Sequence, residues 1–355
     1  MLNRASLEAH KKNCKFLSLN PYHYVPVIEG VYPIPPKTSW YYHAGKFIQK
    51  QNQFIDTTIE YDITDIHHAT HLYINKAKGR LAVELSGGLD TSIIIGLLRD
   101  INEDPYLIGA ESPRFEFRTE RFIQHKLSIN PKKTHLFEDS EGLPFSNLAA
   151  TPTHLLPNKS SLFYYSNIPT LNAAKSFGVS TILNGIGLDS LLIDAVGPSN
   201  KQYCFDISNI DDGWANDYVF EPNGISYVNV GTIPFVRKIL IALRKNQPED
   251  LQKLWARAFF RGQIPRELSL FAYKASFGAV YHQGLEASRE EILAITSNIY
   301  SLTGLSEYLS DSMNLLIDGV LSFDHESEFL FLALLSYAVW VHQLKKDNLI
   351  GPACN

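Results

Sequence analysis

The sequence contains little that would suit an extracellular or nucleic-acid-binding protein. Its 355 residues include only three cysteines, far apart and without metal-ligand or redox spacing: Cys14, Cys204 and Cys354. This cysteine usage is typical of a reducing compartment, so we predict a cytoplasmic protein. Lys and Arg number 32 against 37 Asp and Glu, and the basic residues are scattered, so nucleic acid is not an expected partner.

Long apolar runs are also missing. The longest, residues 329–341 in ESEFLFLALLSYAVWVHQLKK, is too short to span a bilayer and predicts a buried C-terminal helix. Residues 1–16 hold no apolar segment of the kind found in signal peptides. We therefore expect neither a membrane partner nor secretion.

The chain has ample apolar material, because 45% of its residues are hydrophobic. From residue 64 onward, short apolar runs alternate with amphipathic ones. We expect strands at 81–85, 105–110, 132–137 and 179–184, and helices at 64–79, 90–99, 120–127 and 170–177. This order predicts an α/β fold, with a parallel sheet sandwiched by helices and a helical C-terminal part.

Two segments do not fit this alternation. Residues 1–60 carry prolines in VPVIEGVYPIPPKTSWYY and predict an irregular extension. Residues 195–235 are rich in Asn, Asp, Gly and aromatics and predict a long loop.

The most informative stretch is VELSGGLDTSIIIGLL, in which glycines and hydroxyl side chains separate an apolar strand from an apolar helix. Glycines let backbone N–H groups converge, and a helix start adds unpaired N–H groups and a positive dipole end. We expect an anion cradle made by Leu85, Ser86, Gly87, Gly88, Asp90, Thr91 and Ser92. An acid at Asp90 suits a phosphate site when a divalent cation bridges the two. A Walker loop is excluded, since GxxxxGK[ST] is missing here.

SGGLDTS resembles SGGxDS, the pyrophosphate loop of the N-type ATP pyrophosphatases. That superfamily includes asparagine, argininosuccinate, GMP and NAD synthetases. The resemblance implies an adenine-nucleotide α-hydrolase-like fold, also called a PP-loop ATPase. It also implies that ATP is split to AMP and pyrophosphate while a substrate is adenylated.

A second motif, TILNGIGLDSLL, resembles the sGxGxDE strand end of asparagine synthetases at Asn184, Gly185, Gly187 and Asp189. By this resemblance Asp90 and Asp189 would hold Mg²⁺ between them. Two residues depart from the pattern. Ile186 stands where relatives carry a residue that handles the proton of the attacking amine, and Leu188 replaces a small residue.

A third stretch, KLWARAFFRGQIPRELSLFAYKASF, is similar to a helical segment of asparagine synthetases. Lys253, Arg257, Ala258 and Pro265 match its pattern. Lys274 falls near the lysine that steadies charge on the acyl-adenylate, a task that suits an ammonium. The arginine expected two residues earlier is Ala272, and a solvated surface lysine is the alternative for Lys274.

The resemblance divides the chain into residues 1–64, an extension or the remnant of a glutaminase-like domain, and 65–355, a synthetase domain. Glutaminase activity would need a cysteine where Leu2 follows Met1, so no ammonia from glutamine is expected.

Among relatives, DSLLIDAVGPS and the terminal helix resemble the lasso peptide macrolactam synthetases most. This implies ATP and Mg²⁺ as cofactors, with a precursor peptide and a leader peptidase as partners. ATP would adenylate a side-chain carboxylate, and the peptide's own N-terminus would close the ring. Two alternatives stay open: a small-molecule amide synthetase (β-lactam or ammonia-dependent asparagine forming) and a nucleotide-binding protein without catalysis.

Overall fold

The computed structural model describes residues 38–43, 46–51, 62–76, 79–154, 157–193, 213–243, 253–270, 278–303, 306–323 and 325–349. The chain divides into two compact units. Unit 1 comprises residues 1–53, 142–167 and 277–355, and unit 2 comprises 54–141 and 168–276. The division at residue 64 and the remnant of a lost domain stay predictions, since they concern relatives of this chain.

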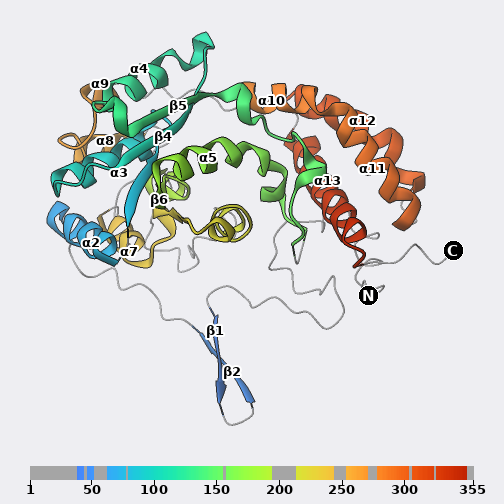
Figure 1. The fold of residues 1–355 in the computed structure, drawn as a ribbon, viewed down its shortest axis with the longest axis horizontal. Coiled ribbons are helices and arrows are strands. Elements are labelled where there is room, and N and C mark those ends of the chain that lie inside the picture. The colour runs from blue at the N-terminus through green and yellow to red at the C-terminus, as the bar shows by residue number, and fades with distance from the viewer. Residues whose placement is uncertain are drawn as a thin grey trace. The chain divides into compact units, whose positions relative to one another are not determined.

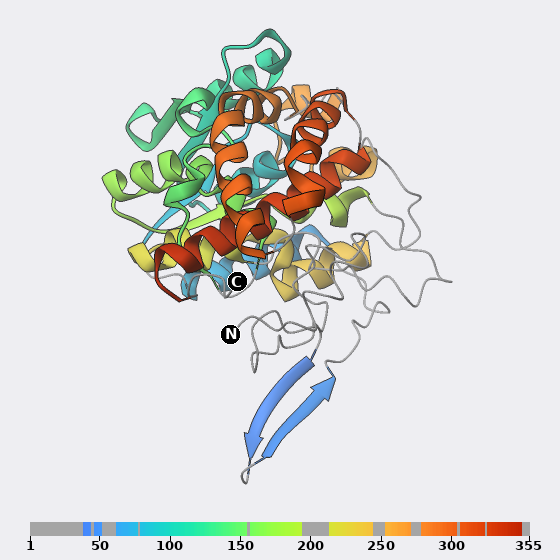
Figure 2. The same cartoon turned by 90° about the vertical axis from the view of Figure 1, so that its right-hand side faces the viewer.

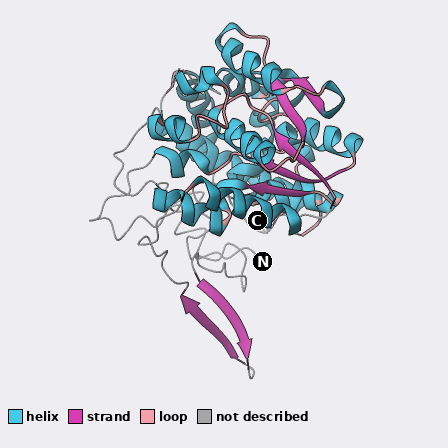
Figure 3. Ribbon diagram, turned by 90° about the vertical axis from the view of Figure 1, so that its left-hand side faces the viewer, coloured by secondary structure: helices cyan, strands magenta, loops and turns pink. Residues whose placement is uncertain are grey.

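Unit 2 is built on a five-stranded parallel sheet in the order β5-β4-β3-β6-β7 (Figure 1). Its strands are β3 (Arg80–Glu84), β4 (Tyr106–Glu111), β5 (Thr134–Glu138), β6 (Val179–Asn184) and β7 (Ser226–Asn229). They appear as adjacent arrows in Figure 3. The predicted α/β fold with a parallel sheet is thus confirmed, and the four predicted strands correspond to β3 to β6.

The helices of unit 2 are α2 (Ile63–Lys76), α3 (Leu89–Asp100), α4 (Arg118–Leu127), α5 (Ile168–Phe177), α6 (Leu188–Ile193), α7 (Pro234–Leu243), α8 (Leu254–Phe259) and α9 (Arg266–Leu270). They cover both faces of the sheet. Val83 and Leu85 share one apolar core with α3. Residues that alternate with them lie on the other face, where Tyr106 packs on Phe177 of α5 at 4.8 Å between ring centroids.

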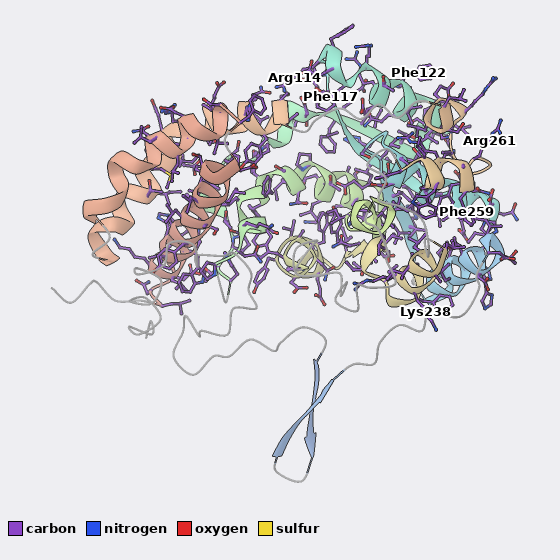
Figure 4. The ribbon with its side chains drawn as sticks, turned by 180° about the vertical axis from the view of Figure 1, so that it is seen from behind. Arg114, Phe117, Phe122, Lys238, Phe259 and Arg261 are labelled. Atoms are coloured by element: carbon purple, nitrogen blue, oxygen red, sulfur yellow. The ribbon has the colours of Figure 1, made fainter. Side chains whose placement is uncertain are left out.

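The outer side of α4 shows what the covering helices leave to solvent. Phe122, labelled in Figure 4, is 55% exposed, and Lys126 lies 6.0 Å from the centre of its ring. Lys126 also forms an ion pair with Glu267 of α9 at 2.7 Å. This pair is a surface feature that joins two helices.

The predicted long loop at 195–235 is wrong in its second half. A π-helical turn, η9 (Asn216–Phe220), a 3₁₀ turn, η10 (Glu221–Asn223), and strand β7 lie there. Phe220 stacks on Tyr227 of β7 with 4.2 Å between the ring centroids. This stacked pair lies on the same face of the sheet as α5. Residues 195–212 lie outside the described part of the chain.

Unit 1 contains α10 (Gly278–Ala287), α11 (Arg289–Thr303), α12 (Ser306–Leu321) and α13 (His325–Lys346), seen in orange and red in Figure 2. The predicted buried C-terminal helix is confirmed in α13, where the fully buried Trp340 donates its indole N–H to the carbonyl of His154 at 2.8 Å. Among the described helices, none has the length and apolarity to cross a membrane.

In the predicted irregular segment at 1–60, the described residues form a β-hairpin. Strands β1 (Thr38–His43) and β2 (Lys46–Gln51) pair antiparallel in the register Thr38↔Gln51. The proline-rich stretch before β1 lies outside the described residues.

Candidate active site

The candidate site lies where the strand order of the unit 2 sheet reverses, between β3 and β6. From β3 the chain adds β4 and then β5 on one side, whereas β6 and then β7 lie on the other side of β3. In doubly wound α/β sheets, ligands bind outside the carboxyl ends of the strands at this switch point. The two glycine-containing motifs of the sequence follow β3 and β6, so both lie at this position.

The first loop is held in shape by its own hydroxyl groups. Ser86 Oγ accepts a hydrogen bond from the N–H of Gly88 at 3.2 Å and lies 3.0 Å from Thr91 Oγ1. Ser92 Oγ donates to the carbonyl of Gly88 at 2.7 Å. Ser92 and Thr91 are buried, whereas Ser86 is exposed. The buried hydroxyls therefore support the loop, and Ser86 is the one that a ligand can reach directly.

Helix α3 begins immediately after this loop. Gly88 occupies its N-cap position with an extended backbone, and Leu85 still donates to the carbonyl of Ile108 in the sheet at 2.7 Å. The first-turn N–H groups of a helix have no partner within it, and they carry its positive dipole end. The loop thus directs backbone donors to the edge of the sheet.

Close packing against α4 requires a glycine at position 87. Its φ of +77° lies in the left-handed region, and a Cβ there would stand 2.3 Å from the carbonyl oxygen of Glu120 in α4. Any side chain at position 87 would displace the backbone of α4. The contact between Gly87 and α4 therefore holds the loop in place.

The second loop is shaped by a pair of asparagines. Asn184 ends β6 and donates its side-chain amide to Asn229 Oδ1, at the end of β7, at 2.5 Å. Asn184 Oδ1 accepts from the N–H of Ile186 at 2.9 Å. Both asparagines are buried. Asn229 was not predicted from the sequence because its strand was missed.

The two loops lie against each other. An ideal Cβ on Gly185 would be 3.0 Å from Asp90 Cβ and 3.5 Å from Thr91 Cγ2. Ile186, next in the chain, is 41% exposed. The structure thus brings together the predicted residues of both motifs, which are about 100 positions apart in the sequence.

Asp90 has a cationic partner that the sequence did not assign to the site. Lys253 Nζ lies 2.7 Å from Asp90 Oδ1, and the two side chains are 7% and 16% exposed. Lys253 stands at the N-cap of α8 with a φ of +54°, which costs an L-residue about 1–2 kcal/mol. The ion pair and this conformation place an ammonium group beside the loop.

For two predicted site residues, Asp189 and Lys274, the structure gives no side-chain position. Asp189 lies in α6, but its side chain is not among those described. Lys274 belongs to residues 271–277, which lie outside the described chain. Leu188 is buried in the core beneath the second loop.

In the part of the chain that the structure describes, no three His, Cys, Asp or Glu side chains gather into a group that could hold a metal ion. Mg²⁺ in nucleotide enzymes takes one or two carboxylates and completes its shell with phosphates and water. Asp90 provides one such carboxylate beside the loop. Its surroundings therefore fit an ion that arrives with a nucleotide.

A further polar group was missed in sequence analysis. Glu84, the last residue of β3, accepts a hydrogen bond on Oε2 from the Tyr227 hydroxyl at 2.6 Å. Burial raises the pKa of the Glu84 carboxyl, and the hydrogen bond from Tyr227 lowers it to a lesser extent. A carboxyl group that ends a strand two residues before Ser86 of SGGLD was the available signal.

The chain was also compared with known proteins. No family model matches it. The search of curated proteins gave no match either.

Proposed function

We propose that this protein is an ATP-dependent, AMP-forming amide synthetase of the N-type ATP pyrophosphatase kind. The observation that carries the proposal is the meeting of SGGLDTS and NGIG at the switch point of a parallel sheet, with Gly185 against Asp90. Neither loop alone would be specific. Together they offer an anion cradle and a carboxylate at the edge where α/β sheets bind nucleotides.

The chain's own residues would act as follows. Backbone N–H groups of Gly87, Gly88 and the first turn of α3 would hold the polyphosphate of ATP. Mg²⁺ bound with ATP at Asp90 would neutralise phosphate charge. Lys253 compensates the charge of Asp90, so the incoming triphosphate does not meet an isolated carboxylate.

The proposed reaction has two steps. A substrate carboxylate attacks the α-phosphate of ATP, pyrophosphate leaves, and an acyl-adenylate forms. An amine then attacks the acyl carbon and AMP leaves. Holding both substrates at one sheet edge replaces their chance encounter. Lys274, Asp189 and the glycines of the second loop would complete the site by the resemblance to asparagine synthetases.

For the substrates, we propose an Asp or Glu side chain and the N-terminus of the same precursor peptide, closed to a macrolactam after a leader peptidase has acted. The support is the resemblance of the stretch after NGIG and of the terminal helix to lasso peptide cyclases. Small-molecule amide synthesis is the alternative within the same chemistry. We place the protein in the cytoplasm.

A second candidate function is nucleotide binding without turnover. The observation in its favour is Ile186, an apolar side chain that is 41% exposed and follows Gly185, the residue that lies against Asp90. Isoleucine can neither donate nor accept a proton. In this case the protein would bind ATP and release no AMP.

The test is product analysis with ATP, Mg²⁺ and candidate substrates: small precursor peptides encoded beside the gene, with their leader peptidase, or aspartate with ammonia. We expect AMP together with a peptide lighter by the mass of one water. Asp90→Ala should abolish both products, and Lys126→Gln, which alters only surface contacts with Glu267 and Phe122, should not. AMP with aspartate and ammonia alone would assign small-molecule synthesis. ATP binding without AMP under every condition would exclude a ligase.

A further inference from the structure

Glu84 belongs to a row of polar side chains at the carboxyl edge of the sheet. Parallel pairing sets Val83 opposite Leu183, so Glu84 comes next to Asn184, which is itself paired with Asn229. Residues paired across parallel strands face the same side. The row therefore runs over β3, β6 and β7, one residue before the two loops.

The two carboxyl oxygens of Glu84 differ. Tyr227 holds Oε2, and Tyr227 is itself fixed by stacking on Phe220 with an angle of 8° between the rings. Oε1 makes no hydrogen bond to any described residue, and the Glu84 side chain is only partly exposed. Glu84 thus presents one fixed and one available oxygen.

Burial raises the pKa of Glu84, and no charged side chain contributes to this shift. Among the described residues, the titratable group in contact with it is Tyr227. A desolvated carboxyl with one oxygen left unpaired by the described residues suits a group that must bind a cation and take a proton from it. The other strand-ending acids differ, because Glu111 pairs with His125 and Glu138 accepts from Ser140.

We propose that Glu84 Oε1 receives the amine substrate of the proposed synthetase and accepts its first proton. The proposal rests on the proposed function. The amine arrives as an ammonium ion and gives one proton to Oε1, which leaves a neutral nucleophile. The nitrogen then bonds to the acyl carbon, the bond to AMP breaks with its electron pair on AMP, and the second proton leaves to water. Glu84 afterwards returns its proton to solvent.

The first experiment needs no substrate. In protein labelled with ¹³C at the Glu side-chain carboxyls, the Glu84 signal is the one missing from Glu84→Gln and shifted in its titration by Tyr227→Phe. Propylammonium chloride should perturb this signal and lower its apparent pKa, whereas sodium chloride at equal concentration should not. An equal response to both salts overturns the proposal, whatever becomes of the proposed function.

The second experiment separates adenylation from amide formation. It uses as substrate the carboxylic acid that supports AMP formation in the product analysis. Glu84→Gln should keep ATP–pyrophosphate exchange and lose amide formation by at least about 100-fold. Hydroxylamine, already unprotonated at neutral pH, should still be acylated at nearly the wild-type rate. Glu138→Gln is the matched control, because it alters another strand-ending acid, and it should behave as wild type.

Tyr227→Phe gives a readout that a purely structural role would not move. Loss of its hydroxyl removes the hydrogen bond that lowers the pKa of Glu84. The acid limb of the pH profile for amide formation should therefore move to higher pH, while that for ATP–pyrophosphate exchange stays in place. Wild-type amide synthesis by Glu84→Gln, or an unmoved limb in Tyr227→Phe, overturns the proposal. If no carboxylic acid supported AMP formation but the Glu84 signal still responded to propylammonium, only the proposed function would be rejected.

Discussion

At the scale of single residues, we expect the ion pair of Lys253 and Asp90 to contribute strongly to the free energy of unfolding. Both side chains are largely buried, so removing one partner leaves a charge in a poorly solvated position. We expect Lys253→Gln to lower the free energy of unfolding by about 3 kcal/mol, the lower end for buried pairs, because Asp90 keeps some exposure. Urea denaturation would measure it.

The matched control is Lys126→Gln, which removes an ion pair of equal length between side chains that are 43% and 35% exposed. Such surface pairs contribute at most about 1 kcal/mol. If the two variants lost equal stability, the Lys253 pair would be no more than a surface contact. Asp90→Asn combined with Lys253→Gln should cost less than the sum of the single changes, because neither buried charge is then left alone.

The residues of the two loops could be predicted from the sequence because their chemistry is local. SGGLDTS is a continuous strand–loop–helix junction, and NGIG ends a strand of its own. The partners that complete the site are contributed by tertiary structure. Asn229, Lys253 and Tyr227 reach Asn184, Asp90 and Glu84 over sequence separations that no short pattern encodes.

At the scale of elements, strands β3 to β6 were predictable because short runs containing apolar residues alternate with helical segments along the chain. Strand β7 was missed because SYVN has only four residues and follows a stretch of Asn, Asp and Gly that favours a loop. Its place at the edge of the sheet comes from pairing with β6 and from the stacking of Tyr227 on Phe220. These contacts outweigh the local signal.

The contact between the first loop and α4 leads to a prediction about Gly87. Gly87→Ala must adopt a left-handed φ and also push back the carbonyl of Glu120. Gly224 has a similar φ of +73° with nothing within 4 Å of its Cβ position. Gly224→Ala should therefore cost only about 1–2 kcal/mol, the conformational term alone.

Gly87→Ala should cost more than Gly224→Ala and should also weaken ATP binding at least about tenfold, because the shifted loop misdirects its N–H donors. Denaturation and calorimetric titration on both variants would measure these effects. Equal losses of stability and unchanged ATP affinity would mean that α4 does not hold the loop.

At the scale of the whole molecule, all described parts of the candidate site belong to unit 2. This unit contains the loops after β3 and β6, the acids Glu84 and Asp90, and Lys253 at the start of α8. Unit 1 has a separate apolar core of α10 to α13 with residues 145–163. A ligand held by the loops should therefore change the stability of the two units to different extents.

Hydrogen exchange with mass spectrometry can test this difference on the full chain. With Mg²⁺ and ATP at about 100 times the Kd, binding stabilises the folded state by about 2.7 kcal/mol. We expect slower exchange in peptides covering residues 85–92 and 184–188, with the core of α13 as the internal reference. In Asp90→Ala the effect should vanish, since the carboxylate proposed to hold Mg²⁺ is gone. Slower exchange confined to α13, with both loops unchanged, would place the nucleotide in unit 1 and contradict a site at the switch point of the sheet.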